Sequence, residues 1–212
     1  MNALSQRLLP LINKDRLRDT LFSFVQVPSP TGQVAAFAEQ YATTLRGAGL
    51  RDVQLLPTPG WADSPSVVAF RRGAGGGPTL HFNGHMDHIH QGHVAPYIDG
   101  DRVVGRGSAD MKYGLVGALE VVRVLDEAGV QLPGDILLSG HDLHENPVGH
   151  GEGVRSLIDN GFIGDAVIVT EGPKDEVHIG GKSNSLFYID ITWEGPAQHE
   201  LTVAPGTPSV IE

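Results

Sequence analysis

The stretch GDAVIVTEGP, residues 164–173, indicates the fold class of this chain. It holds a short apolar run, Ala166–Thr170, which is followed at once by a carboxylate, Glu171. An earlier run, Ile136–Ser139, has the same character. Neither run alternates cleanly between apolar and polar residues, and such short apolar runs are typical of the buried parallel strands of an α/β sheet. We therefore expect both segments to be strands of such a sheet.

Helical and extended patterns elsewhere in the chain fit the same architecture. The spacing of apolar residues predicts helices over 15–25, from an N-cap at Thr31 to about Leu45, from about Met111 to Ala128, and around Val154–Ile158. Further strands are expected at Val53–Leu56, Ser66–Phe70 and Thr79–Phe82, with a glycine-rich turn at 71–78 between the last two. These elements predict an α/β domain with a mostly parallel central sheet.

A second domain is expected to begin near Gly180–Gly181. In SLFYIDITWEG, residues 185–195, Phe187, Ile189, Ile191 and Trp193 fall on one side of an alternating pattern. That pattern is typical of a half-exposed strand in an antiparallel sheet. We therefore assign residues 1–180 to the first domain and residues 181–212 to the beginning of a second, which is too short to fold by itself.

Composition excludes several classes of site. The chain has 212 residues, a formal net charge of −10 and no cysteine. The acidic balance argues against a nucleic-acid partner, and the lack of cysteine means that a metal site must use nitrogen and oxygen ligands. Neither a signal peptide nor a membrane-spanning run of about 20 apolar residues is apparent, so a cytoplasmic protein is expected.

Three of four groups of candidate functional side chains come directly after expected strands, where sites in α/β sheets usually lie, and the fourth, Asp110, opens a helix beyond a loop. The four groups are His85 with Asp87, Asp110 in GRGSADMK, His144 with Glu145, and Glu171. Asp87 could orient His85 or bind a metal beside it, since residues two apart in extended chain point the same way. We assign no metal to the other nearby histidines: His81 falls within a strand, His88 and His90 near the site or on the surface, and His141 and His150 in an exposed loop.

Each carboxylate of these groups also has a simpler structural interpretation. Asp110 could bridge two cations or could cap a helix, and its neighbour Lys112 is expected to be solvated or salt-bridged. Glu171 could bind a metal or form a salt bridge. His144 and Glu145 could divide the roles of ligand and general base, which metal-assisted hydrolysis requires.

The order of these motifs resembles the zinc aminoacyl-peptidase family, which includes acetylornithine deacetylase, succinyl-diaminopimelate desuccinylase, aminoacylase and glutamate carboxypeptidase. GHMDH and GRGSADMKYG carry the resemblance, with VPSPTG, GDAVIVTEGP and GPAQHE in support. The resemblance implies a zinc-peptidase-like catalytic domain with helices on both faces of its sheet, followed by the start of an α+β lid or dimerisation domain. It also implies a hydrolase that cleaves a peptide or N-acyl amino acid amide bond with a metal-activated water.

The resemblance implies two divalent ions, zinc with cobalt or manganese as alternatives, and a role for each site residue. His85 and Glu171 would bind one metal, Asp110 would bridge both, Glu145 would bind the other, and Asp87 would orient His85. His199, in GPAQHE, would help to hold the scissile carbonyl of a small-molecule or peptide substrate, in a homodimer formed through the lid.

The sequence departs from the family pattern at two places. His144-Glu145 stands where the family usually has two glutamates, the first a general base and the second a ligand, so either His144 or Glu145 could be the base. The family's chains are also longer and supply one more histidine ligand, so we expect a C-terminally truncated chain. The alternative function is therefore a non-catalytic fragment that binds metal or assembles with a partner.

Overall fold

The computed structural model describes residues 3–172. The expected boundary at Gly180–Gly181, the expected strand within 185–195 and His199 lie outside the described residues. The helices are α1 (Ala3–Leu8), a 3-10 turn (Leu9–Leu11), α2 (Lys14–Val25), α3 (Ala35–Gly47), α4 (Tyr113–Glu127) and α5 (Glu152–Asp159). The strands are β1 (Arg51–Thr58), β2 (Trp61–Arg71), β3 (Leu80–His85), β4 (Tyr97–Asp99), β5 (Arg102–Val104), β6 (Ile136–His141) and β7 (Ala166–Val169).

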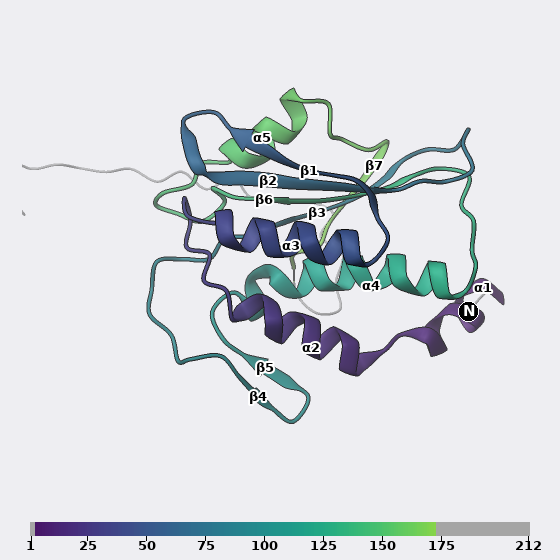
Figure 1. Ribbon diagram of the computed structural model, residues 1–212, viewed down its shortest axis with the longest axis horizontal. Helices are drawn as coiled ribbons and strands as arrows, with labels where there is room; N and C mark the ends of the chain where they lie inside the picture. Colours follow the sequence, from purple (N-terminus) through teal and green to yellow (C-terminus); the bar gives the residue numbers. More distant parts are fainter. Residues whose placement is uncertain (1–2, 173–212) are drawn as a thin grey trace, which may run out of the picture. The chain divides into compact units, whose positions relative to one another are not determined.

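The central sheet has five strands in the order β1-β2-β6-β3-β7 (Figure 1). β3 pairs in parallel with both β6 and β7, whereas β2 pairs antiparallel with both β1 and β6. Within this sheet β2 alone runs against the other strands, so the prediction of a mostly parallel sheet is confirmed. The glycine-rich segment 71–78 connects β2 to β3, but these strands are not neighbours because β6 lies between them.

Helices cover both faces of the sheet, as expected. On one face α3 packs on β1 and β2, α4 packs on β3 and β6, and α2 packs on α4, while α5 lies on the other face (Figure 1). The larger core centres on an edge-to-face contact of Phe24 with Phe37 and Tyr41. Aromatic and aliphatic side chains therefore hold α2 and α3 against the sheet and leave its strand ends free for polar groups.

Strand β7 is the edge of the described sheet, and the expectation that it is buried is wrong. It pairs in parallel with β3 as expected, yet Val167, Ile168 and Val169 are 45%, 45% and 59% exposed. An apolar run by itself does not distinguish a central strand from an edge strand, because both contain the same residue types.

One local prediction near the helices is also wrong. Thr31 does not cap α3, whose N-cap is Val34 with no side-chain hydrogen bond. The hydroxyl of Thr31 instead donates to the carboxylate of Asp87. The β4–β5 hairpin was not expected from the sequence.

Among the described helices, none has the length and apolar character needed to span a membrane.

Glu120 of α4 anchors the segment that precedes α2. Its carboxylate is buried and accepts hydrogen bonds from the backbone N–H of Asn13 at 2.9 Å and from Nε and Nη2 of Arg16 at 2.8 and 2.7 Å. Burial alone raises the pKa of Glu120, but the hydrogen bonds from Arg16 and Asn13 outweigh it and hold the pKa below its ordinary value.

We expect Glu120→Gln to lower the free energy of unfolding by about 2 kcal/mol near neutral pH, the scale of hydrogen bonds to a charged group. Because the folded pKa of Glu120 lies below the unfolded value of about 4.3, this stabilisation is present above pH 4.3 and is lost as the pH falls through the folded pKa. Urea unfolding of both proteins at several pH values measures it. The control is Glu127→Gln, which removes the more exposed carboxylate that also pairs with Arg16 and should cost under about 1 kcal/mol. Equal effects of the two substitutions would contradict the prediction.

Candidate metal centre

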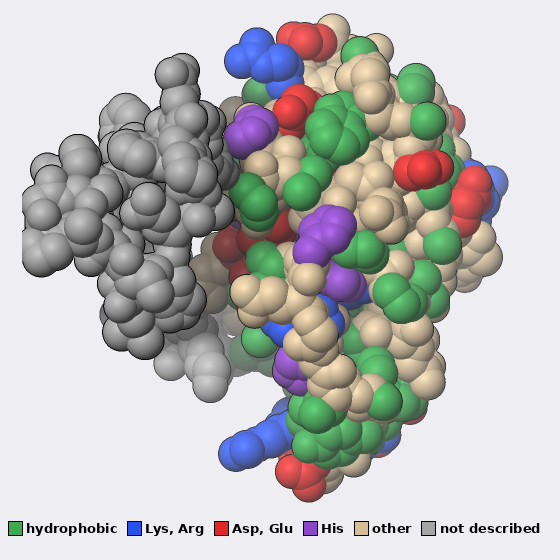
Figure 2. All heavy atoms as spheres, turned by 90° about the vertical axis from the view of Figure 1, so that its left-hand side faces the viewer, with side chains coloured by type: hydrophobic (Ala, Val, Ile, Leu, Met, Phe, Trp, Pro, Cys, Tyr) green, Lys and Arg blue, Asp and Glu red, His purple; other side chains and the backbone are tan. Residues whose placement is uncertain are grey.

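The carboxyl ends of the parallel strands bring the predicted site residues to one edge of the sheet. His85 ends β3 and lies opposite His141 of β6, so the loop after β6 that carries His144 and Glu145 lies beside it. Glu171 follows β7, the other neighbour of β3. Figure 2 looks onto this end of the molecule and shows histidine side chains at its surface with acidic side chains beside them.

His85 is held so that one ring nitrogen faces the carboxylates. The side chain is 1% exposed, and Nδ1 lies 3.1 Å from the carbonyl oxygen of Asp87 and 3.2 Å from its Oδ1. Nε2 lies 3.0 Å from Oδ1 of Asp110 and 3.9 Å from Oε2 of Glu171. Burial lowers the pKa of His85, but Asp87, Glu171 and Asp110 together raise it above the ordinary value. A proton on Nδ1 leaves Nε2 as the donor atom, which is the arrangement of metal-binding histidines.

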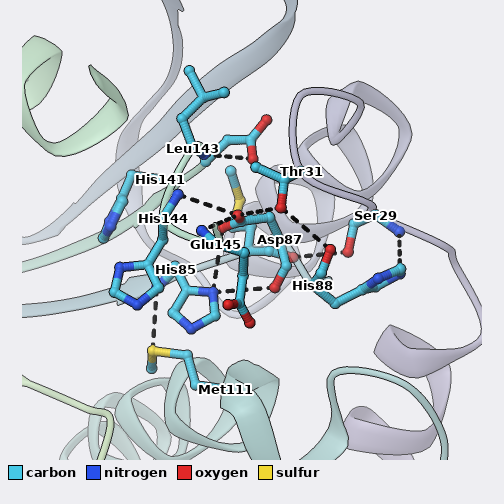
Figure 3. A network of polar contacts seen from close by, with 12 residues as sticks. Ser29, Thr31, His85, Asp87, His88, Met111, His141, Leu143, His144 and Glu145 are labelled. Carbon is cyan, nitrogen blue, oxygen red and sulfur yellow. Dashed lines mark hydrogen bonds and ion pairs between the residues drawn. The ribbon is translucent and has the colours of Figure 1, made fainter. Parts of the chain in front are cut away.

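Asp87 connects His85 to the loop after β6 (Figure 3). It is fully buried, and Oδ2 accepts hydrogen bonds from the hydroxyl of Thr31 at 2.9 Å and from the backbone N–H groups of His144 and Glu145 at 3.1 and 3.0 Å. Burial alone would raise the pKa of Asp87, but His85 and these donors hold it at about 2. The carboxylate is therefore placed to orient His85, which is the first of the two roles considered for it.

The four predicted ligands, together with His144, form two overlapping groups that share His85. One group is His85, Asp110 and Glu145, and the other is His85, His144 and Glu171; within each, the donor atoms lie within 4.8 Å of one another. Burial and the nearby Asp110 raise the pKa of Glu145. Acidic groups this close repel one another, and a divalent cation among them would offset that repulsion. The donor atoms, all nitrogen and oxygen, therefore fit the divalent ions expected from the sequence.

His144 lies directly against His85. Their rings stack with centroids 4.2 Å apart and an interplanar angle of 15° (Figure 3), and Nε2 of His144 is 3.6 Å from Oε2 of Glu171. The preceding residue, Leu143, is buried with a φ of 62°. A positive φ is uncommon for a leucine, and such strain is often kept where a loop must present functional side chains.

Lys112 is buried and not solvated or salt-bridged, so that expectation is wrong. Its Nζ donates to the carbonyl oxygens of Phe24 at 3.0 Å and Val27 at 2.9 Å and lies 3.8 Å from the ring centroid of Phe37. Burial lowers the pKa of Lys112 to about 7. Lys112 thus ties the turn that carries Asp110 to the end of α2, because last-turn carbonyls of a helix need donors.

The sequence misplaced one histidine and missed two residues that support Glu171. His141 is buried at the end of β6, although His150 is exposed as expected.

The hydroxyl of Tyr113 donates to the carbonyl oxygen of Gly172 at 3.0 Å and accepts from its N–H at 3.2 Å. Gly114 lies directly against Thr170. No local pattern could reveal the last two contacts, since they join residues more than 50 positions apart.

Comparison with known proteins gives one matching family model. The model described as Peptidase family M20/M25/M40 matches residues 81–210. The N-formyl-4-amino-5-aminomethyl-2-methylpyrimidine deformylase of Halalkalibacterium halodurans is 28% identical over 186 residues, which cover 79% of this chain and 42% of that protein. The chain therefore spans less than half the length of this relative.

Solved structures share the fold. Aminopeptidase PepT from Bacillus cereus matches with a TM-score of 0.56 and 26% identity, over 64% of this chain and 38% of that one. The M20 family metallo-carboxypeptidase Sso-CP2 from Sulfolobus solfataricus matches with a TM-score of 0.62 and 23% identity, over 74% of this chain and 37% of that one.

Proposed function

This chain belongs to peptidase family M20/M25/M40, and from that premise we propose that it is a metal-dependent hydrolase that cleaves an amide bond. The observation that carries the proposal is the convergence of His85, Asp110, Glu145 and Glu171, from four separate segments, at the carboxyl edge of the sheet. Relatives named as a deformylase, an aminopeptidase and a carboxypeptidase support an amide bond as the target. A peptide or an N-acyl amino acid is the proposed substrate class.

The proposed site holds two divalent ions, zinc with cobalt or manganese as alternatives. His85 and Glu171 would hold one ion, Glu145 would hold the other, and Asp110 would be shared by both. When bound, such ions polarise an amide carbonyl and lower the pKa of water.

The remaining residues have proposed roles of their own. Asp87 keeps Nδ1 of His85 protonated and so keeps Nε2 available as a donor. Either His144 or Glu145, which the loop after β6 presents side by side, accepts the proton of the attacking water. His199 contacts the substrate carbonyl, a homodimer forms through the second domain, and the protein acts in the cytoplasm.

The test is zinc binding and amide hydrolysis by the wild-type chain and by His85→Ala. Calorimetry should show zinc binding that weakens by more than about 100-fold in His85→Ala, beyond the 10- to 100-fold effect of losing an outer-shell partner. The matched control is His93→Ala, which removes an exposed histidine. Failure of the wild-type protein to bind zinc would contradict the proposal.

Hydrolysis is measured on a panel of N-formyl and N-acetyl amino acids and dipeptides. Activity should disappear with a chelator and return with zinc. Zinc binding without hydrolysis of any panel member would favour the alternative, a metal-binding chain that does not turn over by itself.

A further inference from the structure

We propose that His144 is a metal ligand, which shares one ion with His85 and Glu171, and is not the proton acceptor. The inference rests on the proposed function and assigns a role that was left open there. His144 occupies the position at which the sequence departs from the two glutamates usual in the family. Because a histidine stands here in place of a glutamate, its role can differ from that of the glutamate. Imidazole is among the commonest metal ligands.

The distances between donor atoms suit one shared ion. Nε2 of His144 lies 3.6 Å from Oε2 of Glu171, and Nε2 of His85 lies 3.9 Å from the same oxygen. Two ligand atoms at the usual zinc distances of about 2.0–2.2 Å, in tetrahedral geometry, are separated by about 3.4 Å. Each nitrogen–oxygen distance is therefore within about half an ångström of the value for a shared ion, and the two stacked rings need to tilt toward a common point to bind it.

Two neighbouring histidines contact the His144 ring. The backbone N–H of His144 donates to Asp87, and the ring stacks on His85. On another side it meets the edge of the His141 ring, with centroids 6.1 Å apart and an interplanar angle of 75°. His141 is itself buried, and its Nδ1 lies 3.3 Å from Nδ2 of Asn83. These contacts place Nε2 of His144 near Glu171 on the exposed side of the site, from which the ring can turn toward an ion shared with His85.

Glu145, the neighbour of His144 in the sequence, faces the group that contains Asp110. Glu145 lies with His85 and Asp110, and its backbone N–H donates to the same oxygen of Asp87 as that of His144. Because Asp87 fixes both backbone N–H groups, the two side chains are presented to different donor groups. With His144 bound to an ion, Glu145 is left as the proton acceptor of the pair, through the carboxylate oxygen that does not serve the second ion.

The experiment compares cobalt and zinc binding by the wild-type chain, His144→Gln and His150→Gln. His150 lies on the same loop and is exposed, so its substitution is the matched control. We expect His144→Gln to weaken the binding of one ion at least tenfold by calorimetry and to change the visible absorption of bound cobalt. His150→Gln should change neither.

Two results would overturn the inference. Unchanged metal affinity and cobalt absorption in His144→Gln, with loss of hydrolysis, would make His144 the proton acceptor and leave the proposed function intact. Absence of metal binding by the wild-type chain would instead remove the proposed function together with this inference.

If His144→Gln does not fold, His144→Glu, which restores a carboxylate usual in the family, takes its place. X-ray absorption of the zinc-loaded proteins should then show one imidazole ligand fewer than in the wild type, and an unchanged number would refute the assignment.

Discussion

Replacement of Asp87 by alanine is expected to lower the free energy of unfolding by about 3–5 kcal/mol, the usual cost of removing one partner from a buried charged network. The same substitution should weaken zinc binding about 10- to 100-fold, the usual effect of losing a residue that orients a ligand. Both effects have one cause, because a single fully buried carboxylate holds His85, Thr31 and the loop after β6 together.

The physical reason is the set of groups that Asp87 leaves behind. The backbone N–H groups of His144 and Glu145 and the hydroxyl of Thr31 all donate to Oδ2, and each would lose its buried acceptor. An unpaired buried donor costs about 1–3 kcal/mol. His85 would also lose the contact between Nδ1 and Oδ1 and keep only the carbonyl oxygen of residue 87, so its Nε2 would be held less firmly toward Asp110.

Chemical unfolding in the presence and absence of zinc measures both consequences. Asp87→Asn keeps the size of the side chain and one acceptor oxygen but removes the charge, so its effect should be intermediate. The control is Asp159→Ala, an exposed aspartate of α5, which should change stability by no more than about 0.5 kcal/mol. A stability of Asp87→Ala within 1 kcal/mol of the wild type would show that Asp87 does not hold this network.

The positions of three candidate ligands could be predicted from the sequence because they depend on strand ends alone. His85, Glu145 and Glu171 follow apolar runs, and parallel strands place their carboxyl ends at one edge of a sheet. That rule needs neither the order of the strands nor their partners.

The order and direction of the strands were harder to predict from the sequence. β2 is buried along Ser66–Ala69 like a central parallel strand, although it runs antiparallel to both neighbours. Burial on both faces, and not direction, determines an apolar run. Strand β7 departs from this rule, because it is apolar although it is exposed, and its sequence therefore looked like that of a buried strand.

Residues that support the site through distant contacts were invisible in the sequence. Thr31 had the position of a helix cap, and only the fold brings its hydroxyl to Asp87, 56 residues away. Lys112 had the character of a surface residue, but its long apolar stem allows it to lie inside the protein while Nζ reaches two carbonyl oxygens.

Gly114 determines how closely α4 approaches the end of β7. A Cβ atom at this position would lie 2.1 Å from the carbonyl oxygen of Thr170 and 2.7 Å from its Oγ1. Asp110 precedes α4 in the chain, and Glu171 follows Thr170. The absence of a side chain at Gly114 therefore allows these two carboxylates to meet at the same site.

Gly114→Ala is expected to destabilise the fold by more than the roughly 1–3 kcal/mol that overpacking usually costs, because the clash is with backbone that cannot rotate away. It should also weaken zinc binding, since relief of the clash requires α4 to move away from Thr170 and so separates Asp110 from Glu171. Gly117→Ala, on the same helix, is the matched control. A Cβ atom at Gly117 would meet nothing within 4 Å. That substitution should stabilise the protein by up to about 1 kcal/mol, the helix preference for alanine over glycine. Chemical unfolding measures the effect of each variant on stability, and calorimetry measures its effect on zinc binding. If Gly114→Ala is as stable as Gly117→Ala and binds zinc equally well, close contact between α4 and Thr170 is not what assembles the site.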